Sequence, residues 1–228
     1  PDDNTNPCII CGGGGRAVLY PFEPRDVVKC VQCGFTYVHP MPQPEFFNDV
    51  YEGDYWTNYS VSVGEPHIRD RIDEFLEVSA ERVMRLQRFK SSGCLLDIGC
   101  SMGFLVKAAE DAGFQARGID LSPETLEEGR RKFKVDIRDT RISDLPLNEL
   151  YDAITCYNTI EHIVESQEFL NEMSARLAPD GVLALGTHDV ESETHRREKR
   201  MWKHIMPTEH LYYFRRDDLF AMGARSNL

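Results

Sequence analysis

The sequence predicts an α/β protein: a doubly wound, mostly parallel sheet with helices on both faces, preceded by a small N-terminal module. Two observations lead to this prediction. Between residues 91 and 190, apolar runs typical of buried strands alternate with segments of helical periodicity, which favours a parallel sheet with right-handed crossovers. Ahead of this core, residues 1–40 carry two closely spaced cysteine pairs. Residues 41–90 and 191–228 form the two remaining predicted segments.

The composition is that of an ordinary soluble globular protein. With 228 residues and 41% hydrophobic residues, the chain can form one medium domain with an appendage. No apolar run approaches the roughly 20 residues that span a membrane, and no signal-peptide pattern opens the chain. We therefore expect a cytoplasmic protein without a membrane partner. The formal net charge of -12 argues against contact with the phosphate backbone of a nucleic acid, so we expect no nucleic-acid substrate.

Two C-x-x-C pairs near the N-terminus predict a zinc site. They are separated by 18 residues, within the range of a four-cysteine site, and each is followed by a glycine that allows a tight turn around a sulfur. The four expected ligands are Cys8, Cys11, Cys30 and Cys33. Two disulfides or a redox pair are weaker alternatives, because the other cysteines lie in core-like segments and no βαβ pattern surrounds the pairs. Four thiolates close the coordination shell, so we expect a structural zinc that orders a segment with little core.

Residues 41–90 combine an aromatic-rich segment with a predicted helix. Tyr51, Tyr55 and Trp56 lie among acidic and amide residues without a clear helical period. This pattern suits a cap over a ligand as well as it suits a core. From His67 to Lys90, apolar residues recur at helical spacing, which predicts one long amphipathic helix before the first core strand.

Residues 94–120 carry the most informative pattern in the chain. An apolar run over 94–98 predicts a buried strand, the following turn contains Gly99 and Gly103, and a helix and a second strand ending at Asp120 come next. Such a unit binds an adenosine-type cofactor. The glycines let a ligand approach the backbone, the helix start offers unpaired N–H groups, and the acid accepts hydrogen bonds from ribose hydroxyls.

The spacing of this turn separates two classes of cofactor. A nicotinamide site requires G-x-G-x-x-G, in which the middle glycine admits a pyrophosphate. Here the turn is Asp97-x-Gly99-x-x-x-Gly103, and Ser101 stands near the position of that glycine. A single carboxylate, such as that of S-adenosylmethionine, needs less room. At this turn the sequence resembles the class I S-adenosylmethionine-dependent methyltransferases, and a dehydrogenase is the weaker alternative.

Later segments strengthen the resemblance. Residues 151–158 predict a fourth strand, followed by the pair Glu161-His162, and a Pro-x-Gly turn at 177–181 precedes a fifth strand at 182–186. Members of the family have these features in the same order. The resemblance of this chain to the family extends from residue 94 to about 220 and implies the Rossmann-like methyltransferase fold.

Three weaker predictions complete the core. Ser122 is a residue type that caps helices and precedes a proline, so we expect a helix from 123 to about 132. Residues 135–137 are the expected third strand. Residues 167–177 are the expected helix after the fourth strand.

The resemblance implies a cofactor site around the glycine turn. Gly99 and nearby backbone hold the methionyl group, Asp97 orients its amino end, and Asp120 binds the ribose. Ile142 lies beside the adenine, although many members have an aspartate where this chain has Arg141, so Asp144 or backbone carbonyls are the alternatives for the adenine amino group. The expected cofactor-binding residues are Asp97, Gly99, Ser101, Gly103, Asp120, Leu121, Ile142, Asn158 and His162.

The segment from Trp202 to Phe214 is similar to one that borders the acceptor pocket of many small-molecule methyltransferases. It contains Pro-x-x-His-Leu-x-x-Phe, with His210 at the histidine. A neutral histidine near pH 7 is a natural general base for an acceptor with a hydroxyl or an acidic C–H. We expect His210, and after it His188, to be catalytic. The expected acceptor-side residues are Tyr51, Tyr55, Trp56, Trp202 and Tyr212.

The resemblance implies an enzyme that transfers a methyl group to a small-molecule acceptor, for example a nucleotide-linked sugar or a secondary metabolite, by direct displacement with histidine-assisted deprotonation. The alternative is a non-catalytic zinc-ribbon binding or scaffold protein that retains the cofactor fold. Asp120 counts against it, because a scaffold needs no ribose-binding acid. Sheets of the family usually end with a hairpin, for which residues 223–228 are too short. We therefore expect a truncated chain or a homodimer.

Overall fold

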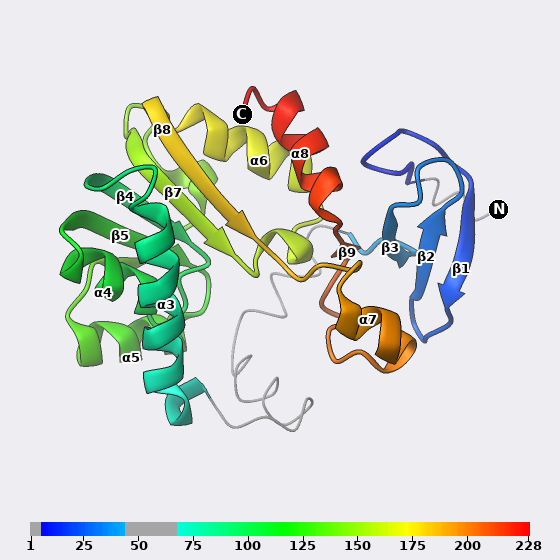
Figure 1. The fold of residues 1–228 in the computed structure, drawn as a ribbon, viewed down its shortest axis with the longest axis horizontal. Helices are drawn as coiled ribbons and strands as arrows, with labels where there is room; N and C mark the ends of the chain where they lie inside the picture. Colours follow the sequence, from blue (N-terminus) through cyan, green and yellow to red (C-terminus); the bar gives the residue numbers. More distant parts are fainter. Residues whose placement is uncertain (1–5, 44–67) are drawn as a thin grey trace. The chain divides into compact units, whose positions relative to one another are not determined.

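The structure is a computed structural model that describes residues 6–43 and 68–228 (Figure 1). The described residues divide into two compact units. The first unit contains the residues up to 43 together with 158–171 and 187–228, and the second contains 68–157 and 172–186. Tyr51, Tyr55 and Trp56 lie outside the described residues. Within the described ranges, the structure has no helix both long and apolar enough to cross a membrane.

The second unit is built on a five-stranded parallel sheet with the order β6-β5-β4-β7-β8 (Figure 1). The strands are β4 (Gly93–Ile98), β5 (Phe114–Asp120), β6 (Ile137–Asp139), β7 (Tyr151–Tyr157) and β8 (Leu177–Gly186). The chain starts in the centre, proceeds outward to β6 and returns to the other side of β4. This confirms the doubly wound α/β fold, and its switch point lies between β4 and β7, where such sheets bind ligands.

Helices α3 (Ile72–Leu86), α4 (Phe104–Asp111) and α5 (Pro123–Phe133) pack on one face of this sheet. Leu95 pairs with Ala116 on one side and with Ala153 on the other, so these three side chains share that face. The helices contribute Val83, Leu86, Leu105, Val106, Ala109 and Leu126 to the same buried cluster. The helix predicted from His67 to Lys90 is shorter in the structure, since a single 3-10 turn over Ile68–Asp70 precedes α3.

Two strand boundaries differ from the prediction. The third strand begins at Ile137, two residues later than expected, because Ile137 is the residue that pairs with Gly118 of β5. The turn expected at 177–181 lies inside β8 as a bulge. Leu177 pairs with Tyr151 and Val182 with Ala153, so the register advances by five residues on β8 and by two on β7.

Helix α5 begins where expected but is not capped as expected. Ser122 occupies the N-cap position before Pro123, yet its side chain makes no capping hydrogen bond. Its backbone N–H donates to Oδ1 of Asp120 at 2.9 Å. The acid at the end of β5 therefore fixes the start of this helix.

The first unit contains a four-stranded antiparallel sheet with the order β1-β2-β3-β9. The strands are β1 (Arg16–Tyr20), β2 (Asp26–Cys30), β3 (Thr36–His39) and β9 (Tyr212–Tyr213). Phe35 is fully buried, and its ring packs against Tyr37, Tyr212 and Phe214. The N-terminal sheet therefore extends beyond the segment 1–40, since its last strand and part of its core come from near the C-terminus.

The same unit holds the short helices and the C-terminal helix. These elements are η3 (Ile160–His162), α7 (Glu193–Glu198), η4 (Lys199–Met201), α8 (Arg216–Arg225) and the first part of α6 (Ser166–Ala175), which passes from one unit into the other. Arg215 donates to the carbonyl of Cys33 at 3.2 Å, and Arg225 donates to that of Ile9 at 2.9 Å. Helix α8 is therefore attached at both ends to the loops that carry the cysteines.

We expect Gly129→Ala in α5 to destabilise the protein, although alanine normally stabilises a helix by about 1 kcal/mol relative to glycine. A Cβ at residue 129 would lie 2.2 Å from the carbonyl oxygen of Met102, so the turn before α4 would have to move. The loss should be about 1–3 kcal/mol in urea unfolding.

Gly223→Ala in α8 is the matched control. There an added Cβ would meet only Leu228, at an ordinary contact distance of 3.7 Å, so this variant should be as stable as the parent or more so. Equal unfolding midpoints for the two variants would contradict the close packing at Gly129.

Candidate functional site

A glycine turn joins β4 to α4 as expected, and it adopts left-handed conformations at three residues. The φ angles are 74° at Gly99, 50° at Ser101 and 79° at Gly103. The N–H groups of Gly99 and Cys100 both donate to the carbonyl of Ile119, at 2.9 and 3.1 Å, which holds the turn against β5. The hydroxyl of Ser101 is buried and has no hydrogen-bond partner among the described residues. This orphaned hydroxyl, in a turn whose glycines adopt left-handed conformations, fits a polar ligand close to the backbone.

Asp120 connects this turn to the next one. Its Oδ2 accepts the N–H of Ser101 at 2.8 Å, and its Oδ1 accepts the N–H of Ser122 at 2.9 Å. Burial raises the pKa of Asp120, while these backbone hydrogen bonds oppose the shift. A carboxylate offers about four acceptor positions. A position that the backbone leaves unused can accept a hydrogen bond from a hydroxyl of a ribose.

Asp97 lies inside β4 and is buried. Its Oδ1 accepts a hydrogen bond from the hydroxyl of Thr155 at 2.7 Å. Burial raises the pKa of Asp97 to about 7, although Thr155 and the charge of Arg82 lower it. A bound ammonium group would favour the ionised carboxylate. The sequence did not indicate the part played by Thr155, but the register of β4 and β7 places it directly opposite Asp97.

The remaining expected cofactor residues are divided between the units. Ile142 is buried at the start of a 3-10 turn of the second unit, and Leu121 follows Asp120 there. Asp144 is exposed and accepts a hydrogen bond from Ser143. Asn158 and His162 belong to the first unit. Their part in cofactor binding stays a prediction, whereas the second unit by itself brings together the residues of the turn, Asp97 and Asp120.

Four histidines gather in the first unit with Trp202 beside them. His188 stacks on His204, with ring centroids 3.4 Å apart and an interplanar angle of 20°. His210 lies 5.7 Å from His188 and meets His162 edge-on at 4.8 Å, centroid to centroid. Trp202 is buried and packs against His188 and His204. The structure therefore brings the two expected catalytic histidines into one cluster, and adds His204, to which the sequence analysis gave no role.

Backbone carbonyls define the protonation of two of these rings. Nδ1 of His210 lies 2.8 Å from the carbonyl oxygen of His204, and Nδ1 of His162 lies 3.0 Å from that of Glu209. Because a carbonyl only accepts, each Nδ1 carries the hydrogen and each Nε2 keeps its lone pair. Burial lowers the pKa of His210 to about 4 and that of His162 well below its usual value. His210 is therefore neutral at pH 7 but a weaker base than an exposed histidine.

Glu161 adds a carboxyl group to the histidine cluster. Its side chain is 1% exposed, and neither carboxylate oxygen has a hydrogen-bond partner of normal length among the described residues. Burial raises the pKa of Glu161 to about 7, although a hydrogen bond with the side chain of Thr187 lowers it. A carboxylate oxygen of Glu161 and one ring nitrogen each of His188 and His210 lie within 4.8 Å of one another. The only signal for Glu161 in the sequence was its place directly after a strand, beside His162.

Tyr212 occupies a different environment from the histidines. Its hydroxyl donates to the carbonyl of Val164 at 2.7 Å, and its ring packs on Phe35 in the core of the four-stranded sheet. Its polar group is already engaged, so its expected contact with the acceptor stays a prediction. The same holds for Trp202, and for the three aromatic residues outside the described part of the chain.

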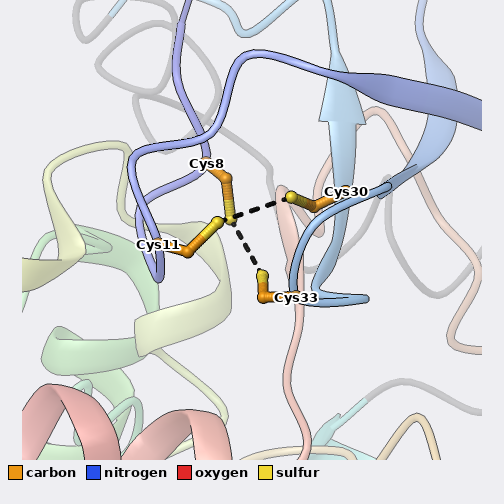
Figure 2. A group of neighbouring side chains, drawn as sticks. All are labelled: Cys8, Cys11, Cys30 and Cys33. Atoms are coloured by element: carbon orange, nitrogen blue, oxygen red, sulfur yellow. Dashed lines mark hydrogen bonds between the residues drawn. The ribbon is translucent and has the colours of Figure 1, made fainter.

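The four N-terminal cysteines point toward one another from two loops (Figure 2). Their sulfur atoms lie within 4.8 Å of one another, with 3.5 Å between Cys8 and Cys33 and 3.6 Å between Cys11 and Cys30. No disulfide joins any of the cysteines in the described ranges. Sulfurs at the corners of a tetrahedron around zinc, at about 2.3 Å from the ion, are roughly 3.8 Å apart. The set therefore fits a zinc ion.

The two loops have the same hydrogen-bond pattern. The N–H of Gly12 donates to the carbonyl of Cys8 at 2.7 Å, and the N–H of Gly34 donates to the carbonyl of Cys30 at 2.9 Å. Both glycines have positive φ angles, 73° and 79°, as the predicted tight turns require. Burial opposes ionisation of Cys30, but the N–H groups of Cys33 and Gln32 and the thiol of Cys11 lower its pKa to about 7.

Comparisons with known proteins bear on the family and the fold of the chain. Residues 68–228 match a family model described as a methyltransferase domain. A curated relative, the ubiquinone biosynthesis O-methyltransferase of Actinobacillus pleuropneumoniae, is 36% identical over 104 residues, which are 41% of this chain and 44% of the relative. The protein with the same description from Rickettsia typhi is 26% identical over 127 residues, 53% of this chain and 49% of the relative. The chain thus spans about half the length of these relatives or less.

Solved structures agree on the fold. The magnesium protoporphyrin IX methyltransferase of Synechocystis, with bound SAH, superposes with a TM-score of 0.62 at 14% identity, covering 81% of this chain and 89% of that one. A SAM-dependent methyltransferase of Thermotoga maritima gives a TM-score of 0.54 at 18% identity, covering 70% of this chain and 78% of that one. At these identities the likeness concerns the fold alone. Because the family model covers most of the sequence, the chain belongs to this family of methyltransferase domains.

Proposed function

We propose that the protein is an S-adenosylmethionine-dependent methyltransferase that acts on a small-molecule acceptor. The observation that carries this proposal is the pair of turns joined by Asp120, which combines left-handed glycines, a buried hydroxyl without a partner and an acid that can accept a further hydrogen bond. Membership of the methyltransferase family supports it. The curated relatives are described as O-methyltransferases, which supports an acceptor hydroxyl.

Each residue of the second unit has a separate role in this proposal. Asp97 pairs with the ammonium group of the methionyl end, Ser101 and the N–H groups near Gly99 bind its carboxylate, and Asp120 binds the ribose. Ile142 offers apolar surface to the adenine. The residues fit the group because Asp97 is buried with a raised pKa and Ser101 has an unsatisfied hydroxyl, so a ligand with one cation and several polar oxygens satisfies both.

When bound, S-adenosylmethionine supplies a methyl group already activated by a sulfonium. The protein then has to align the acceptor atom behind the methyl carbon, exclude water and remove the proton of the acceptor. We assign the removal of this proton to the histidine cluster, with His210 and His188 as the residues that carry it. Asp97 and Asp120 hold the donor while the acceptor oxygen forms its new bond to carbon.

The cysteine site has a structural role in this proposal. Zinc bound by four thiolates has no open position for a substrate. The two cysteine loops also hold α8 through Arg215 and Arg225, so an ordered metal site supports more of the first unit than its own sheet. A non-catalytic scaffold remains the second candidate function, and it would keep the zinc site without binding the cofactor.

Calorimetry with S-adenosylmethionine tests the cofactor. We expect saturable 1:1 binding, and no comparable binding of NAD⁺, which would support the dehydrogenase alternative instead. Asp120→Asn should weaken the binding of S-adenosylmethionine by about 1.5–3 kcal/mol, or roughly 10- to 150-fold, because an amide nitrogen cannot accept hydrogen bonds from the ribose.

Asp73→Asn is the matched control for this substitution. Asp73 is exposed in the first turn of α3, in the same unit, so the loss of its charge should leave the affinity unchanged. Equal affinities of the parent and Asp120→Asn would place the ribose elsewhere. A parent protein that binds neither cofactor would favour the scaffold.

The affinity for S-adenosylmethionine should depend on pH through Asp97. Its pKa of about 7 means that the carboxyl is neutral at lower pH and must lose its proton before it pairs with an ammonium group. The dissociation constant should therefore rise up to about tenfold for each pH unit below 7 and level off above it. Asp97→Asn should bind more weakly at pH 8 and show a flat profile between pH 5.5 and 8. A sloping profile in that variant would assign the titration to another group.

The cysteine site should hold one zinc ion per chain, measured by mass spectrometry of the purified protein. Cys33→Ser should lose most of this zinc and lower the thermal unfolding temperature of the protein, because metal binding contributes to the folding of the first unit. Cys94→Ser is the control, since Cys94 lies at the start of β4 in the other unit. Full zinc content in Cys33→Ser would contradict the four-cysteine site.

A further inference from the structure

We infer that Glu161, His188 and His210 form a binding site for a divalent transition-metal ion, in addition to the cysteine site. All three residues belong to the first unit, and they come from three separate segments of it. Glu161 lies in η3, His188 follows β8 in the chain, and His210 precedes β9.

The positions of the donor atoms support this site. One carboxylate oxygen and two imidazole nitrogens lie within 4.8 Å of one another. Donors bound to one ion at about 2.1 Å are roughly 3.0–4.2 Å apart, depending on the coordination geometry. Small rotations of side chains would therefore bring the three atoms to one ion, and His188 is the half-buried member of the set.

The carboxyl group of Glu161 is the second, independent observation. It is almost completely inaccessible, yet neither of its oxygens has a hydrogen-bond partner of normal length among the described residues. Buried carboxylates are ordinarily paired with a cation, hydrogen-bonded or bound to a metal. A metal ion bound by Glu161, His188 and His210 would supply the missing positive charge.

The hydrogen bond made by the other ring nitrogen of His210 agrees with this interpretation. A metal-binding histidine usually donates its other N–H to a carbonyl or a carboxylate, which holds the ring in place. His210 donates its Nδ1 hydrogen to the carbonyl of His204, and so keeps the lone pair of Nε2 for a ligand. Two imidazoles and one carboxylate are a donor set for zinc, iron or manganese, and three protein donors leave positions for an acceptor.

This inference extends the proposed function, on which its consequence for catalysis rests. A hydroxyl bound to such an ion loses its proton more readily, as metal-bound water does. In that case His188 and His210 would hold the ion instead of acting as bases, and the proton released by the hydroxyl would pass to solvent water.

Titration with Mn²⁺, followed by the electron paramagnetic resonance signal of the free ion, tests the site without cofactor or acceptor. The full chain is first treated with a chelator until one zinc per chain remains. Mn²⁺ favours oxygen and nitrogen donors over thiolates, so it reports on the new site and leaves the zinc-loaded cysteines unaffected. We expect one Mn²⁺ per chain. Glu161→Gln and His188→Asn should each weaken this binding by at least about tenfold.

His39→Asn is the matched control, because His39 lies in β3 of the same unit and outside the three proposed ligands. It should bind Mn²⁺ as the parent does. His188→Asn replaces a half-buried residue and keeps the test valid if Glu161→Gln unfolds, which circular dichroism would reveal. Absence of Mn²⁺ binding to the parent, or equal affinity in the parent and His188→Asn, would overturn the inference. Binding of S-adenosylmethionine is measured separately, so the two proposals can fail independently.

Discussion

The carboxylate of Asp120 determines how the turns of the second unit are arranged. One oxygen holds the N–H of Ser101 in the turn after β4, and the other holds the N–H of Ser122 at the start of α5. The backbone approaches so closely here that a Cβ at Gly118 would lie 2.6 Å from the side chain of Cys100. The start of α5 and the glycine turn are therefore both held by one half-buried carboxylate. Loss of that carboxylate would alter the arrangement of both.

The first unit is stabilised in a different way, because its sheet is small and includes a strand of two residues. Its order depends on contacts between distant parts of the chain. The ring of Phe35 packs against Tyr212 and Phe214, and Arg215 and Arg225 bind carbonyls of the two cysteine loops. A metal ion held by both loops would connect these contacts further. The N-terminal cysteines and the C-terminal helix therefore support one structure, although more than 180 residues separate them in the sequence.

The sequence predicted those features that depend on local pattern. The apolar run of β4, the glycine turn after it, and the acid ending β5 follow from residues close together in the chain. The features that it did not predict depend on distant partners. The third strand was predicted two residues too early, because β6 has only three residues, two of them exposed, and its apolar signal is weak. The burial of Glu161 depends on segments that include residues 187–210, and no periodicity around residue 161 indicates it.

Asp97 and Glu161 present the same electrostatic situation in the two units. Each is a buried carboxyl whose pKa burial raises to about 7, and each lacks a fully compensating positive charge in its unit. A fold retains such groups at a cost in stability, since a hydrophobic residue of similar size would be easier to bury. The cost is offset when a cation binds and the ionised form becomes the stable one. The ammonium group of a methionyl ligand would satisfy this condition for Asp97, and a metal ion shared with His188 and His210 would satisfy it for Glu161. On this view a bound cation completes the charge of each site, because the hydrogen bonds from Thr155 and Thr187 offset the effect of burial only in part.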